Sequence, residues 1–342
     1  MDMARQIARI DPAAGIPGGE VAVECVQPFG SGPPLTVWFQ DQPAHVVAAM
    51  SGRALVLVPD LNMGAEIGVS VAEDGDAKGK AAQFTVARKL ADGIHPVASP
   101  AFDPADGSLF VTRSGARGEN VPVSLFRIGS DGKLVEFSGD ITNPTSIAFD
   151  RSGCMFVTSR LDGVVYRVTP LKEVVVFASD LGIAPGLAFN REGEMFVGDR
   201  SGAIYRVNEI GEAKPWAQLE PSVSAYHLAF GPDDALYVTG PTVSSFDAIM
   251  RLDDDGEATV FYRGLGRPQG LAFDVAGNLY VAASLRGRRG VVRISPDTKR
   301  AEIVVAGMNL VGLAFSAKGE MVVATNEAVY SLPLGIYGTL LD

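Results

Sequence analysis

Arginine side chains offer the clearest chemistry in this sequence of 342 residues, because several of them stand where a short apolar run ends and a loop begins. A guanidinium group is planar and always charged, and it binds carboxylates and phosphates through two parallel hydrogen bonds. The arginines in such positions are Arg113, Arg117, Arg160, Arg200, Arg267, Arg286, Arg288 and Arg289. If the fold gathers them at one end, we expect that end to bind an anionic small molecule or an acidic segment of a partner protein.

The three histidines are the side chains whose ordinary pKa is closest to neutrality, so they are the first candidates for a general base. We expect His45 to be a surface residue. His95 precedes Pro96 in a loop, and we keep it as a candidate ligand contact. We expect His227 to pack between strands.

Other active-site signatures are missing from the sequence. It has no Gly-x-Ser-x-Gly, no His-Glu-x-x-His and no Gly-rich phosphate loop leading into a helix. No residue is therefore assigned a catalytic role, and we favour a binding protein over an enzyme.

A triplet that recurs six times indicates the strands that must position these residues. It consists of an apolar residue or Pro followed by Ala and Phe. The Phe residues are Phe102, Phe149, Phe189, Phe230, Phe273 and Phe315. A period near forty residues with short apolar runs inside it is typical of the blades of a β-propeller. We predict an all-β fold, in which residues 89–342 form a six-bladed propeller of four strands per blade.

Two further positions recur within each repeat. An aromatic residue in the second strand should pack between neighbouring blades, and an Arg in the third strand should bind a carboxylate or a carbonyl in a structural role. The outer strand of the last blade has two candidates, residues 336–341 and residues 83–86, of which we favour the first.

Residues 1–88 lack the repeat and contain short apolar or alternating runs separated by Pro, Gly and Asp turns, as in a small β-sandwich. The segments Pro17-Gly18-Gly19, Phe29-Gly30 and Val56-Leu57-Val58-Pro59 resemble the immunoglobulin-like IPT/TIG family. This resemblance implies a spacer or a protein-contact domain.

With Pro268-Gln269-Gly270-Leu271-Ala272-Phe273-Asp274 and Asn278-Leu279-Tyr280-Val281, residues 89–342 resemble the NHL, senescence-marker protein and gluconolactonase group of six-bladed propellers. In the lactonase branch a divalent metal is held by Glu, Asn or Asp at the start of the first strands. The corresponding residues here are Ala98, Thr145, Pro185, Tyr226, Gln269 and Val311. None is a carboxylate, whereas Ca²⁺ prefers oxygen ligands that include carboxylates, so we expect no metal and no cofactor.

Strand alternation places Tyr226 and His227 on opposite sides of the first strand. We expect Tyr226 to face the tunnel together with Gln269 and Thr145. The candidate ligand-binding residues are therefore Tyr226, Gln269, Thr145, Arg267, His95, Arg160, Arg200, Arg286, Arg288 and Arg289.

Composition restricts the partners. The formal net charge of −11 opposes attachment to nucleic acid or to an anionic membrane, since both require a dominant basic surface. The sequence has no apolar stretch long enough to cross a bilayer and no secretory signal, so we expect a cytoplasmic protein. Cys25 and Cys154 fall in different predicted domains and should not form a disulfide.

The sequence favours a recognition propeller that binds a small, anionic ligand or a protein partner at the arginine-bearing tunnel mouth. One alternative is a gluconolactonase-like hydrolase that recruits a divalent metal such as Ca²⁺ through Asp92, Asp140, Asn143 or Asp180. Another alternative is a structural subunit of a larger assembly, with the apolar tail from Leu334 to Leu341 as its interface.

Overall fold

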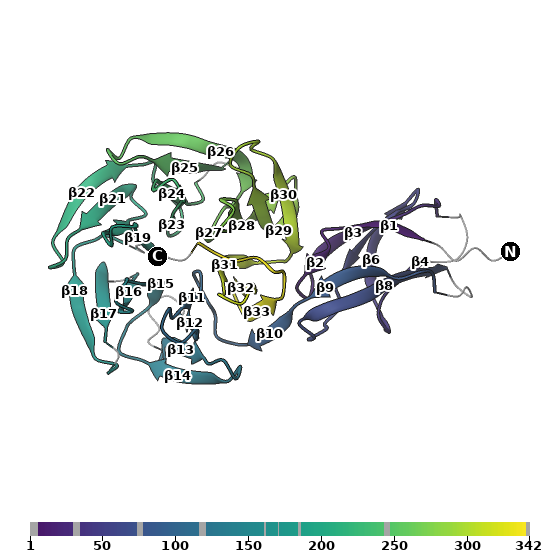
Figure 1. The fold of residues 1–342 in the computed structure, drawn as a ribbon, viewed down its shortest axis with the longest axis horizontal. Coiled ribbons are helices and arrows are strands. Elements are labelled where there is room, and N and C mark those ends of the chain that lie inside the picture. Colours follow the sequence, from purple (N-terminus) through teal and green to yellow (C-terminus); the bar gives the residue numbers. More distant parts are fainter. Residues whose placement is uncertain are drawn as a thin grey trace.

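The computed structural model describes residues 6–29, 35–73, 78–115, 121–160, 162–169, 171–183, 186–242 and 247–339. Every regular element in this part of the chain is a β-strand. It therefore holds no helix that could cross a membrane. A ring of sheets with the arrangement of a β-propeller lies beside a smaller two-sheet part (Figure 1). The protein is therefore all-β, as the sequence predicts. Arg117 and Pro185 lie outside the described residues.

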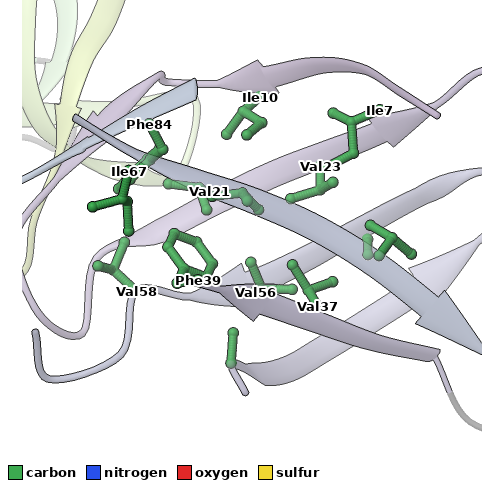
Figure 2. Packing of buried hydrophobic residues seen from close by; sticks show 14 of the residues in the cluster. Ile7, Ile10, Val21, Val23, Val37, Phe39, Val56, Val58, Ile67 and Phe84 are labelled. Carbon is green, nitrogen blue, oxygen red and sulfur yellow. The ribbon is translucent and has the colours of Figure 1, made fainter. Parts of the chain in front are cut away.

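The smaller part consists of two sheets that face each other. One sheet contains, in order, β1 (Ile7–Asp11), β3 (Glu20–Cys25), β7 (Arg53–Leu57) and β6 (His45–Met50). The other contains β2 (Ala14–Gly15), β9 (Ala82–Val86), β8 (Ala65–Glu73), β4 (Leu35–Phe39) and β5 (Gln42–Pro43). In β7 the side chains of Ala54 and Val56 are buried while Arg53 is exposed, which is the alternation of a strand with one face in a core. Figure 2 shows that core.

The larger part is built from antiparallel groups of four strands, which we number as units along the chain. Unit 1 contains β11 (Ala101–Phe102), β12 (Leu109–Thr112), β13 (Leu125–Ile128) and β14 (Leu134–Ser138). Unit 2 contains β15 (Pro144–Phe149), β16 (Met155–Ser159), β17 (Val164–Val168) and β18 (Val174–Ala178). Unit 3 contains β19 (Gly186–Phe189), β20 (Met195–Gly198), β21 (Ala203–Val207) and β22 (Ala213–Gln218).

The remaining groups complete the ring in Figure 1, with the first strand of each nearest the centre. Unit 4 contains β23 (His227–Phe230), β24 (Leu236–Thr239), β25 (Asp247–Leu252) and β26 (Ala258–Gly266). Unit 5 contains β27 (Leu271–Phe273), β28 (Leu279–Leu285), β29 (Arg288–Ile294) and β30 (Ala301–Ala306). Unit 6 contains β31 (Leu310–Phe315), β32 (Met321–Thr325), β33 (Val329–Leu332) and β10 (Arg88–Ala91).

The recurring aromatic residues pack between neighbouring units, as the sequence predicts. The ring of Tyr237 in unit 4 meets Phe273 of unit 5 edge to face, with the ring centroids 4.8 Å apart. Phe156 meets Phe189 in the same way at 5.4 Å. Such aromatic pairs contribute about 0.5–1.5 kcal/mol each beyond the area that they bury. The Phe of each triplet therefore joins its unit to the preceding one.

The recurring Arg of the third strand has the structural role expected of it in four units. Arg251 places Nε 2.8 Å from a carboxylate oxygen of Asp233. The other three pairs join Arg127 to Asp106, Arg206 to Glu194 and Arg293 to Glu302. Arg167 is exposed and has no carboxylate partner among the described residues.

The outer strand of unit 6 is β10, so both segments considered for it from the sequence are wrong. Arg88 lies opposite Ser331, and Ala91 lies opposite Val329. Residues 83–86 belong to β9, which pairs with β8 and β2. Only Ala87 separates β9 from β10, so the chain passes directly from the smaller part into the last sheet of the ring.

The two parts share a continuous sheet through the two-residue strand β2. Gly15 pairs in parallel with both Val86 of β9 and Ala306 of β30. Ile16 adds a backbone hydrogen bond to the carbonyl oxygen of Ala306 at 3.0 Å, and its side chain is buried in the core of units 5 and 6. Backbone hydrogen bonds and a shared core therefore fix the smaller part against the ring.

Candidate functional site

The ring has two ends with different side chains. Because neighbouring strands within a unit are antiparallel, the loops that lead into the first strand and those that join the second strand to the third share one end. We call this the arginine end; among described residues it bears Arg113, Arg160, Arg200, Arg267, Arg286, Arg288 and Arg289. The opposite end, which holds turns such as 150–153 and 274–277, is the carboxylate end.

Acidic side chains at the carboxylate end mostly hold the turns and the third strands. Asp274 accepts hydrogen bonds from the backbone N–H of Ala276 at 3.0 Å and of Asn278 at 2.8 Å. It also accepts one from the hydroxyl of Tyr280 at 3.0 Å, and burial together with this carboxylate raises the pKa of Tyr280 to about 12. These groups explain the fold at this end and need no ligand.

Two buried carboxylates at the arginine end are also fully used by the fold. Asp199 accepts a hydrogen bond from the backbone N–H of Ile183 at 2.8 Å and a second from the hydroxyl of Ser201. Asp247 accepts from both the backbone N–H and the hydroxyl of Thr242, and from the backbone N–H of Arg267 at 3.2 Å. Both carboxylates bind backbone groups of loops, and neither is paired with a guanidinium group of the arginine end within the described residues.

The guanidinium groups of the arginine end are mostly unpaired. Within the described residues, Arg288 is the only one of the seven that lies within 4.0 Å of a carboxylate. Arg160 is half-buried, whereas Arg200, Arg267, Arg286 and Arg289 are exposed. The third-strand arginines, whose carboxylate partners lie toward the opposite end, are mostly paired. The arginine end therefore has positive charge that the described residues do not neutralise.

Buried polar atoms without partners gather where units 1 and 2 meet at the arginine end. They are Oγ1 of Thr112, Nε of Arg113 and Oδ1 of Asn143. The hydroxyl of Ser114 donates to the carbonyl of Pro144 at 3.0 Å, which brings these two stretches of chain together. Asn143 also has a left-handed φ of 48°, and its backbone carbonyl, not its side chain, accepts a hydrogen bond from the backbone N–H of Arg160 at 3.0 Å. This junction has hydrogen-bonding capacity that the protein itself leaves unused.

Tyr226 does not face the tunnel, so this expectation is wrong. Its side chain is buried with Leu236, Val238 and Leu252, and its hydroxyl donates to the carbonyl of Glu220. Burial, aided by nearby carboxylates, raises the pKa of Tyr226 to about 12, so the phenol stays protonated. Tyr226 is therefore a packing residue.

Thr145 and Gln269 are held mainly by local contacts. The hydroxyl oxygens of Thr145 and Thr158 lie 2.9 Å apart, and both residues are buried. Gln269 is half-buried; its backbone N–H donates to Ala282 at 2.9 Å and its carbonyl accepts from Thr239. The structure does not bring these two side chains into contact with each other.

The remaining candidates lie on the loops of the arginine end. His95 is exposed, and its Nδ1 lies 3.2 Å from the carbonyl oxygen of Asn326. Arg288 is withdrawn from any ligand, because its Nη1 lies 2.8 Å from Asp11 of the smaller part and it also donates to the Asp11 carbonyl. Arg286 lies in the turn between β28 and β29, and Arg289 follows Arg288 within β29; both side chains remain exposed.

His227 does not pack between strands as predicted, but faces the ring axis. It lines a channel of 270 Å³ along the ring axis together with Ser99 and Ser146, its counterparts in units 1 and 2. The residue is 8% exposed, and burial lowers the pKa of its imidazole to about 4, which keeps the ring neutral near pH 7. The replacement of a small residue by His at one of six equivalent positions was the signal for this site.

A second recess opens at the carboxylate end. It has a volume of 520 Å³ and is lined by Phe230, Pro232, Val275 and Tyr337, with the ion pair between Arg191 and Asp234 at 3.1 Å. The C-terminal segment 334–339 crosses this end: Thr339 donates to Phe273 at 3.1 Å, and Val275 donates to Tyr337 at 2.9 Å.

The side-chain types that commonly bind metal ions do not cluster in the described residues. Within the described residues, no three His, Cys, Asp or Glu side chains gather in a way that could hold a metal ion. Asp92 pairs with Lys89 at 2.9 Å, which lowers the pKa of the Asp92 carboxyl through that hydrogen bond. Cys25 and Cys154 are not joined by a disulfide.

No protein-family model matches the chain, and no curated protein matches it. Solved structures do resemble it. An auxiliary nutrient binding protein from Bacteroides thetaiotaomicron matches with a TM-score of 0.55 and 14% identity over 96% of this chain and 98% of its own. A gluconolactonase from Xanthomonas campestris matches with a TM-score of 0.58 and 19% identity over 72% of this chain and 89% of its own.

A third match is the virginiamycin B lyase from Staphylococcus aureus, with a TM-score of 0.52 and 16% identity over 87% of this chain and 98% of its own. At these identities the matches show the fold alone. The larger part of the chain has the fold of the β-propeller proteins.

Proposed function

We propose that this protein is a binding protein whose arginine end recognises a small carboxylated molecule. In this proposal the ring is a six-bladed propeller of the NHL and gluconolactonase-like kind, and the smaller part is an immunoglobulin-like domain of the IPT/TIG type that acts as a rigid spacer. The observation that supports it best is the set of unpaired guanidinium groups at one end of a chain whose net charge is −11.

The charge argument is physical. A protein with excess acid can usually pair its arginines, and on the third strands four of five are paired. Unpaired guanidinium groups on the loops of a rigid scaffold are available for two-point binding of a carboxylate. Arg113, Arg160 and Arg200 lie on consecutive units, and Asn143 adds a free acceptor between the first two.

The full-length likeness to an auxiliary nutrient binding protein also supports a binding role, because that match extends over both parts of the chain. The hydrogen-bonded continuity of the sheet through β2 supports a spacer that orients the binding end relative to the smaller part. The alternative of a structural subunit with an interface on the C-terminal tail is less favoured. The described part of that tail packs on the ring, with Leu334 and Ile336 against the core of units 5 and 6.

The test uses glucuronate and glucose, which differ in a single carboxylate. Calorimetry should detect glucuronate and not glucose, with affinity that falls as salt rises. The double variant Arg160→Ala/Arg200→Ala should weaken glucuronate binding at least tenfold, since each charge-assisted hydrogen bond contributes about 1.5–3 kcal/mol. The matched control is Arg151→Ala/Arg167→Ala, which removes the same charge from exposed residues of the carboxylate end. Equal losses in both variants would show that the arginine end is not the site.

The gluconolactonase-like alternative has its own test, favoured by the likeness to the Xanthomonas campestris enzyme. Hydrolysis of glucono-δ-lactone would be followed at constant pH with and without a chelator. A rate above background that the chelator abolishes would support this alternative and contradict a purely binding role. Binding of glucuronate without lactone turnover supports the proposal.

A further inference from the structure

The axial channel is apolar along its length, with polar groups at its two ends. It runs along the inner strands from Ser99, Ser146 and His227 to Gly338 and Thr339 of the C-terminal segment. Between these ends its walls are apolar residues of the triplets, and none of the described residues that line it carries a charge. An ion in such a channel would lose its hydration without gaining a counter-charge, so only an uncharged molecule fits.

Packing does not explain the imidazole at position 227. The equivalent residues of other units are small because the inner strands approach closely: a Cβ on Gly312 would lie 2.3 Å from the Cα of Ser99, and one on Gly186 would lie 2.2 Å from the carbonyl oxygen of Tyr226. His227 has no hydrogen-bond partner among the described residues, although the residue as a whole is 8% exposed. Its ring nitrogens are not among the fully buried polar atoms that lack a partner, so they are open to the channel, where a molecule from outside the protein can bind them.

The recess at the carboxylate end continues the channel. Phe230, Gly338 and Thr339 line both hollows. Val275 and Tyr337, which line only the recess, are 68% and 49% exposed, so apolar surface is open to water there. The volume of 520 Å³ is in the range of sites that hold small organic molecules.

We propose that the channel and the recess together bind an uncharged amphipathic small molecule, whose hydroxyl group pairs with the ring of His227 and whose apolar body lies against Phe230 and Tyr337. A neutral imidazole offers one donor and one acceptor, and a hydroxyl group offers both in return. The recess lies at the carboxylate end, whereas His227, the first residue of β23, lies nearer the arginine end. The proposed molecule uses none of the arginines of the carboxylate site, so this proposal does not depend on that one.

The test uses 2-naphthol and naphthalene as probes on the full chain with isotope-labelled histidine. The sequence has three histidines, of which His45 and His95 are exposed, so the ring signals of His227 are readily distinguished. We expect 2-naphthol to shift the signals of His227 and to leave those of His45 and His95 in place. We also expect 2-naphthol to bind about fivefold more tightly than naphthalene, as one neutral hydrogen bond would provide.

The variant His227→Ser installs the residue that units 1 and 2 have at this position, and His227→Gln provides a second variant that retains a hydrogen-bonding side chain. In His227→Ser the preference for 2-naphthol over naphthalene should vanish, while naphthalene binds as before. His227→Gln should retain part of the preference. Unmoved His227 signals at saturating 2-naphthol, or equal shifts of all three histidines, would overturn the proposal.

Discussion

At the scale of single residues, Tyr226 and His227 point to the sides opposite to those predicted. Alternation itself holds, because Tyr226 is buried in the core of units 3 and 4 while His227 lines the channel. β23 begins at His227, which pairs with Thr239 without a register shift, and Tyr226 precedes the strand. Alternation says that two neighbours point to opposite sides, but not which of the two sides faces the channel.

The burial of His227 has a measurable consequence for acid stability. Its pKa is about 4 in the folded protein and about 6.5 when unfolded, so its favourable contribution is complete above about pH 6.5 and is lost as pH falls towards 4. At pH 4.5 we expect the free energy of unfolding of the wild type to have dropped by about 2–3 kcal/mol more than that of His227→Asn, relative to pH 7.5.

Urea denaturation of both proteins at the two pH values measures this difference. Carboxyl groups also titrate in this range, but they are common to both proteins and cancel in the comparison. A variant that loses as much stability as the wild type would show that the imidazole is protonated in the folded protein.

At the scale of the elements, the repeat was predictable and the junctions were not. The triplets, the aromatic residues of the second strands and the arginines of the third strands follow from a period near forty, because each must fill the same place in every unit. The pairing of β2 with β30 could not be foreseen, since two residues are too few to show any periodicity. The same holds for β10, whose four residues complete a sheet begun more than two hundred residues later.

The junction between the two parts depends on Gly19. A Cβ at Gly19 would lie 2.5 Å from the carbonyl oxygen of Ala306, which accepts the N–H of Ile16. Gly19→Ala should therefore separate β2 from β30 and speed hydrogen exchange at the amide of Ile16 by at least tenfold. Overpacking of this kind typically costs about 1–3 kcal/mol.

The neighbouring Gly18 supplies the control for this prediction. It has a φ of 76° and nothing within 4 Å of an added Cβ, so Gly18→Ala strains the backbone without touching the junction. Exchange at Ile16 should then remain close to that of the wild type after correction for global stability. If the two variants exchange equally fast at Ile16, the contact with Ala306 is not what holds the parts together.

At the scale of the whole molecule, the distribution of charge separates the two ends of the ring. Most acidic groups of the carboxylate end are used in turns and ion pairs, whereas in the part of the chain that the structure describes only Arg288 of the arginine end is paired with a carboxylate. The sequence could identify these arginines and the end that they share. It could not show that Arg288 binds Asp11, because that contact joins residues 277 positions apart.

The central claim is that the arginine end binds a carboxylate. Chemical-shift changes of the Nε–H groups of the arginine side chains test it directly. Nuclear magnetic resonance of the Nε–H groups observes both ends of the ring in a single titration with glucuronate. We predict shifts at Arg113, Arg160 and Arg200, and none at the paired Arg206 and Arg251. Shifts confined to the arginines of the carboxylate end, with those of the arginine end unmoved, would contradict the account.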